Sequence, residues 1–135
     1  MKYIIASILL TLIILTACDK LEISSKQSET FVRYYGVGLE DEGTKVITTS
    51  TGYLIMANIE NPGSGKDICI ITTDKFGNTT SPITTIGGLF DDIGYAIKPT
   101  SDGYIIAGST QGGIDADKDV YAVKLRPDGS LEWDK

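Results

Sequence analysis

The sequence predicts an all-β fold built from two similar units, and three observations support this prediction. Fifteen glycines and frequent threonines favour turns and strands over helices. A polar turn followed by a strand occurs at 50–58 and again 51 residues later at 101–109, which indicates an internal repeat. The repeated strand is apolar on both faces, unlike a strand that is covered on one face only.

The first unit, 31–86, contains the residue types of four strands separated by turns. The opening 31–36 is followed by an acidic turn at 40–43, and strands are expected at 44–49, 53–59, 67–73 and 79–86. The loop at 60–66 and the turn at 74–78 are rich in glycine, asparagine and aspartate. Gly77 or Asn78 suits the positive φ of a hairpin turn.

The second unit, 87–135, repeats this order. Asp92 and Gly94 match Asp41 and Gly43 of the first unit. A strand is expected at 119–125, followed by a hairpin turn at 126–129. Three residues recur at intervals of 51, namely Phe31, Pro82 and Trp133. Residues 133–135 are therefore interpreted as the start of a third copy.

Four strands in about 50 residues is the arrangement of a propeller blade, whose middle strands are covered by neighbouring blades on both sides. The predicted fold class is therefore two four-stranded antiparallel propeller-like blades, a partial β-propeller. Because propellers close with about 4–8 blades, we expect missing blades or self-association to complete it. The open face of the last blade is expected to carry Tyr121, Val123 and Ile105 or Ile106.

The N-terminus has the pattern of an export signal followed by a tether. Lys2 precedes an apolar run at 4–14, and small residues lead to Cys18, so 1–17 is predicted to be a signal peptide. The apolar run of about 14 residues is shorter than the roughly 20 that a spanning helix needs. An ordinary signal that happens to contain a cysteine is the other alternative. The polar stretch 18–30 is predicted to be a flexible tether.

The Leu15-Thr16-Ala17-Cys18 stretch resembles the lipobox of bacterial lipoproteins. In that family the cysteine thiol receives a diacylglyceryl group and the chain is cut before it. The resemblance therefore implies that Cys18 is the lipidated first residue of the mature protein and its attachment to a membrane. It implies a location in the bacterial cell envelope, at the outer membrane or the cell surface.

The two units resemble the tandem propeller-type repeats of bacterial secreted proteins and surface lipoproteins. The resemblance is carried by 102–108, Asp119, Lys124 and Gly129. The first unit departs from this pattern, since Thr51 replaces the turn aspartate and Thr72 replaces the lysine. The resemblance covers residues 31–135 and implies a fold more than a function.

Charge and composition narrow the function classes. The net charge of −6 argues against a nucleic-acid partner, and the absence of histidine removes the commonest general base and metal ligand. The loop at 115–119 lacks the glycine and glutamate of a calcium-binding EF-hand, because Val120 and Arg126 stand there. Asp41 and Asp92 are interpreted as structural rather than as an acid–base pair or cation site, and Cys69 as a buried, inert thiol.

The sequence therefore predicts a lipid-anchored, non-catalytic binding or scaffold module, without catalytic residues, metal or cofactor. Its ligand is expected to be a glycan, a peptide or a protein. Two alternatives stay open at this point. One is a fragment of a propeller-type hydrolase or lyase, although no nucleophile motif is present. The other is a truncated remnant without a function of its own.

Overall fold

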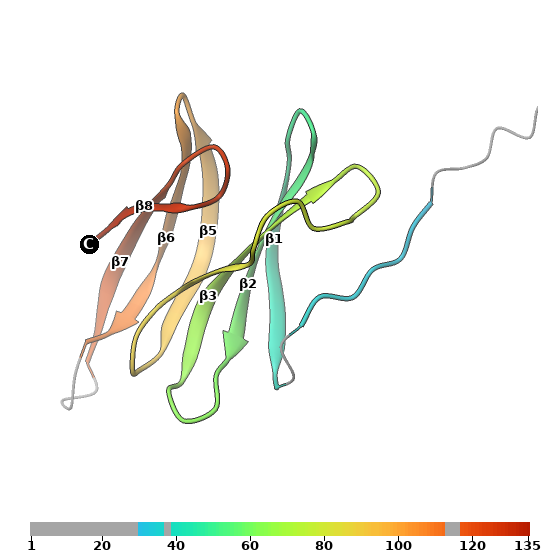
Figure 1. Cartoon of the computed structure of the whole chain (residues 1–135). Coiled ribbons are helices and arrows are strands. Elements are labelled where there is room, and N and C mark those ends of the chain that lie inside the picture. The colour runs from blue at the N-terminus through green and yellow to red at the C-terminus, as the bar shows by residue number, and fades with distance from the viewer. Residues whose placement is uncertain (1–29, 37–38, 113–116) are drawn as a thin grey trace, which may run out of the picture.

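The computed structural model describes residues 30–36, 39–112 and 117–135, and within these ranges all regular elements are β-strands (Figure 1). The expected signal, Cys18 and the tether up to residue 29 lie outside the described residues. Eight strands are present there: β1 (Asp41–Thr48), β2 (Gly52–Glu60), β3 (Lys66–Asp74), β4 (Thr84–Ile86), β5 (Asp92–Thr100), β6 (Gly103–Gln111), β7 (Lys118–Leu125) and β8 (Leu131–Asp134).

The strands form two antiparallel sheets, each with its strands in chain order. Sheet 1 has the order β1-β2-β3-β4 and sheet 2 has the order β5-β6-β7-β8. The predicted fold class, two four-stranded antiparallel blade-like units, is therefore confirmed. In the part of the chain that the structure describes, no helix has the length and apolar character needed to cross a membrane.

We call the two faces of each sheet front and back. The front face of sheet 1 packs on the back face of sheet 2, and Figure 1 shows the two sheets adjacent. The front of sheet 1 consists of Leu54, Met56, Ile68 and Ile70. The back of sheet 2 consists of Ile97, Tyr104, Ile106, Tyr121, Val123 and Leu125. This shared core explains why the middle strands are apolar, since burial of each such side chain contributes roughly 1.5–3 kcal/mol.

The back face of sheet 1 is formed by Ile55, Ala57, Ile59, Cys69 and Ile71. Tyr35, from the segment before β1, packs against this face. Alternate residues of β2 therefore point to two different apolar clusters. One cluster lies between the sheets, and the other lies under the N-terminal segment. In Figure 1 this segment runs on the side of sheet 1 that is away from sheet 2.

The expectation that Tyr121 and Val123 lie on an open face is wrong. Their side chains are 7% and 0% exposed, because they belong to the back face of sheet 2, under sheet 1. Ile106 is also fully buried there, whereas Ile105 points to the opposite, front face and is half-buried. A strand that is apolar on both faces does not by itself indicate which of its faces is open.

The acidic turn expected at 40–43 is also wrong. Asp41, Glu42 and Gly43 pair with β2, and the ladder shifts register between Gly43 and Lys45. The matched residues of β5 show the same shift between Gly94 and Ala96. A bulge absorbs an extra residue, and exposed acidic side chains suit a solvated edge strand, so this stretch extends the strand instead of ending it.

The expected fourth strand at 79–86 is shorter in the structure. β4 covers only Thr84–Ile86, and Thr79 makes an isolated bridge to Thr73. Pro82 lies between these two contacts and has no N–H to donate, so the ladder along β3 is interrupted. The equivalent part of sheet 2 has Trp133 in place of this proline, and β8 there pairs with β7 over Val123–Leu125.

Candidate functional site

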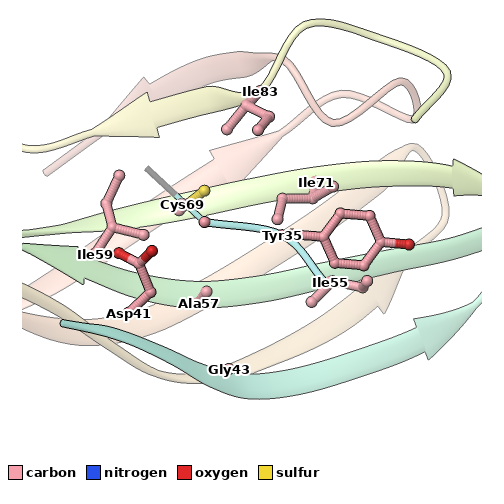
Figure 2. A pocket seen from close by; sticks show the side chains of 10 residues that line it. Tyr35, Asp41, Gly43, Ile55, Ala57, Ile59, Cys69, Ile71 and Ile83 are labelled. Carbon is pink, nitrogen blue, oxygen red and sulfur yellow. The ribbon is translucent and has the colours of Figure 1, made fainter. Parts of the chain in front are cut away.

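A small apolar hollow on the back face of sheet 1 is a first candidate site (Figure 2). Its volume is about 100 Å³. The floor comes from β2 and β3, and the rim comes from the segment before β1 and the start of β1. The lining residues are Tyr35, Gly36, Asp41, Gly43, Ile55, Ala57, Ile59, Cys69, Ile71 and Ile83. Its size and apolar floor suit a small apolar group rather than an extended ligand.

Tyr35 covers this hollow because the segment that carries it is fastened to a hairpin turn. The Tyr35 hydroxyl donates a hydrogen bond to the carbonyl of Gly77 at 2.6 Å. Gly77 has φ +77°, and a Cβ there would lie 2.5 Å from the ring of Phe31. The turn therefore needs glycine both for its conformation and for the close passage of the N-terminal segment.

Cys69 lies in the floor of the hollow and is 2% exposed. Burial, and secondarily the negative charge of Asp41, raises the pKa of its thiol to about 11. The thiol is therefore protonated at neutral pH, and a protonated thiol is a poor nucleophile. The buried position predicted from the sequence is confirmed.

A second candidate site is a pair of buried carboxylates at the junction of the two sheets. Asp67 of β3 is 7% exposed and Asp92 of β5 is 6% exposed. They flank Gly87, where a Cβ would lie 2.0 Å from Asp67 Oδ1 and 2.9 Å from Asp92 Oδ2. The backbone N–H of Gly88 donates to Asp92 Oδ2 at 2.8 Å, which fixes that side chain.

Asp67 is the member of this carboxylate pair with an unsatisfied oxygen. Burial and the neighbouring charge of Asp92 raise its pKa, and a hydrogen bond from Asn61 opposes them. Asn61 Nδ2 donates to Oδ2 at 2.6 Å, but Oδ1 is buried without a hydrogen-bond partner. Sequence reasoning found Asp92 but missed its pairing with Asp67. No local signal indicates that pairing, because it depends on how the two sheets pack.

Tyr121 links the region of the Asp67–Asp92 pair to β8. Its hydroxyl donates to Asp134 Oδ2 at 2.8 Å. Burial, then the bond to Asp134, and then the surrounding aspartate charges raise its pKa, so the phenol stays protonated. Within the described ranges, no group of three or more His, Cys, Asp and Glu side chains is placed to hold a metal ion.

The motif residues Asp102 and Lys124 form a structural tie in sheet 2. Lys124 Nζ lies 2.8 Å from Asp102 Oδ1 and 3.1 Å from Thr100 Oγ1. The bond from Lys124 lowers the pKa of Asp102. In sheet 1 the positions of Asp102 and Lys124 are held by threonines, and Thr72 accepts a bond from Thr80 instead. In sheet 2 this motif therefore links the β5–β6 turn to β7.

The sequence-predicted site residues are thus separated by the fold. Asp41 lies on the rim of the hollow, Asp92 lies beside Asp67, and Cys18 is outside the described residues. Of the loop at 115–119, only 117–119 is described.

Comparison of the chain with models of known protein families, with curated proteins and with solved structures found no match.

Proposed function

We propose that the chain is a lipid-anchored, non-catalytic scaffold or binding module of the bacterial cell envelope. The observation that carries the proposal is the Leu15-Thr16-Ala17-Cys18 stretch after a short apolar run and before a polar segment. In this proposal the lipid on Cys18 attaches the protein to a membrane. The two packed sheets form the part that meets its ligand.

The chemistry of the described sites supports binding rather than catalysis. The Cys69 thiol is protonated and enclosed. The backbone of Gly87 and Gly88 occupies the space next to the Asp67 and Asp92 carboxylates. Exposed apolar side chains lie instead on the front face of sheet 2, where Val120 is 86% and Trp133 41% exposed. Exposed apolar side chains on a sheet face favour another protein surface over a small glycan.

The test is lipid labelling of the full-length chain in a bacterial host. We expect a chain labelled with a radioactive fatty acid to be found in the membrane fraction. Cys18→Ser should lose both the label and membrane retention, because the acyl chains attach through that thiol. Cys69→Ser is the matched control, since it removes the other cysteine and should keep both. Undiminished label and membrane retention in the Cys18→Ser chain would refute the proposal.

A further inference from the structure

The repeat relates the faces of the two sheets residue by residue. Leu54 and Met56 of β2 correspond to Ile105 and Ala107 of β6, and Ile68 of β3 corresponds to Val120 of β7. The front face of sheet 2 is therefore the counterpart of the front face of sheet 1. In sheet 1 that face is the one that packs on a neighbouring sheet.

Among the described residues, nothing covers the front face of sheet 2. Val120 is 86% exposed, whereas its counterpart Ile68 is 0% exposed. Trp133 of β8 pairs with Lys124, which pairs with Ile105, so its side chain adds to the same face, where it is 41% exposed. Lys98 and Lys124 also lie on this face, so its apolar side chains are interspersed with two basic ones. Exposed apolar side chains gathered on one face of a sheet are typical of an interaction site.

As far as the described residues go, the back face of sheet 1 is open along β1. Val46 is 57% exposed, whereas its counterpart Ile97 in sheet 2 is 2% exposed under the front of sheet 1. A Cβ on Gly94 would meet Met56 Sδ at 3.0 Å and Ile68 Cγ1 at 3.4 Å, but a Cβ on Gly43 would meet nothing within 4 Å. An open hollow of about 420 Å³ lies here, lined by Gly43, Thr44, Lys45, Val46 and Ile55.

We propose that the front face of sheet 2 in one copy docks on the β1 side of the back face of sheet 1 in a second copy. The contact would repeat, between two molecules, the part of the packing of sheet 1 on sheet 2 that lies along β5, the counterpart of β1. It is head-to-tail, because the two surfaces differ, so it closes into a ring or extends as a chain. The inference concerns the folded part alone and does not depend on lipid at Cys18.

The N-terminal segment confines this contact to the β1 side of the face. Tyr35, which packs on the back of sheet 1, has Ile86 as its counterpart one repeat later. Ile86 belongs to β4, which pairs with β3, so it is part of the neighbouring sheet itself in the internal contact. Phe31 lies close to Gly77 on this same face. The segment therefore takes the place of the outer strand of a docking sheet, and the second copy contacts only the part of the back face along β1.

The contact between copies should be weaker than the internal one. Across the internal contact, the Gly94 N–H donates to Asn58 Oδ1 at 2.9 Å, and Asn58 Nδ2 donates to the Gly94 carbonyl at 3.3 Å. The counterpart of Asn58 is Ser109, whose shorter side chain cannot make both bonds. Ala107 likewise fills less space than Met56. We therefore expect reversible association that depends on concentration.

A pair of cysteines tests this geometry in the full-length chain. Gly43→Cys combined with Val120→Cys places thiols at the counterparts of Gly94 and Ile68, which are in contact within one molecule. Whole cells that express this chain are treated with a mild oxidant and analysed on non-reducing gels. We expect a ladder of dimers and larger species. Either single variant alone should give only monomer, and co-expression of the two should give dimers without larger species.

The control replaces Val120→Cys by Leu89→Cys, which is 77% exposed but lies in the loop between β4 and β5. Val46→Cys serves as a second reporter on the back face should Gly43→Cys disturb the bulge. Cross-linking no stronger than in the Leu89 control, with both reporters, overturns the proposal. Dimers from Val120→Cys alone would mean a front-to-front contact, which also overturns the proposal. Cross-links only to other proteins would mean a different partner and would overturn it as well.

Discussion

At the scale of single residues, Asp67 shows how packing sets the behaviour of a side chain. Its carboxylate faces Asp92 in a buried site, one of its oxygens has no partner, and its pKa is raised. A raised pKa means that the folded state prefers the protonated form. The contribution of this group to stability is therefore complete at low pH, and it is lost as pH rises through the raised pKa.

We predict that Asp67→Asn stabilises the protein at pH 7. The amide removes the repulsion from Asp92, can donate to that carboxylate and can still accept from Asn61. An unsatisfied buried acceptor costs about 1–3 kcal/mol, so the melting temperature should rise by several degrees. The gain should shrink at pH 4. Asp119→Asn at the exposed counterpart is the control in thermal melts followed by circular dichroism, and an equal gain there would contradict this explanation.

Cys69 gives a second prediction at this scale. In a Cys18→Ser background it is the single remaining thiol. With its pKa raised to about 11 and its side chain 2% exposed, it should react with maleimide at pH 7 far more slowly than a free cysteine. Denaturant should restore the ordinary rate. Mass spectrometry of timed samples measures this difference, and rapid labelling of the native protein would show that the hollow opens readily.

At the scale of strands and turns, glycine positions separate two kinds of constraint. Gly63 and Gly129 have nearly the same positive φ, +86° and +84°. A Cβ on Gly63 would meet nothing within 4 Å, whereas one on Gly129 would lie 2.9 Å from Thr72 Cγ2 and 3.3 Å from Ile70 Cγ2. The turn of sheet 2 at Gly129 therefore also contacts sheet 1.

We predict that Gly63→Ala lowers the free energy of unfolding by about 1–2 kcal/mol, the cost of a left-handed residue with a Cβ. Gly129→Ala should cost that amount plus about 1–3 kcal/mol for overpacking between the sheets. Denaturant unfolding of both variants measures the difference. Equal losses would mean that Ile70 and Thr72 move aside without cost.

The order of strands and turns was predictable from local chemistry. Turns lie at 74–78 and 126–129 as expected, and Gly77 has the positive φ predicted for Gly77 or Asn78. The predictions that were wrong or missing concern features that depend on partners distant in the sequence. The strand role of Asp41 depends on pairing with Ile59, and the carboxylate pair requires the two sheets to pack. The functional proposal rests on Cys18, which lies outside the described residues, so the labelling experiment and not the fold tests its lipidation.

At the scale of the whole molecule, the two sheets share one core. The largest cluster of buried side chains takes residues from β2, β3 and β4 on one side and from β5, β6 and β7 on the other. Neither sheet can bury these side chains alone. We therefore expect the described body to unfold in a single cooperative transition. The sequence predicted two apolar faces for each sheet, but which face was covered followed only from the packing.

Two adjacent isoleucines on β6 provide the last prediction. Ile106 is fully buried between the sheets, whereas Ile105 is half-buried on the front face. Ile106→Ala should lower the free energy of unfolding by about 2–5 kcal/mol, since it leaves a cavity in the shared core. Ile105→Ala should cost clearly less in dilute solution.

The concentration dependence of these two variants then tests the whole molecule. If copies associate through the front face, association stabilises the folded state and raises the melting temperature as protein concentration rises. Ile105→Ala should reduce that rise, whereas Ile106→Ala should lower the melting temperature at every concentration and leave the rise in place. Melting temperatures measured over a hundredfold range of concentration distinguish the two. A wild-type melting temperature that does not change over that range would count against association of copies through this face.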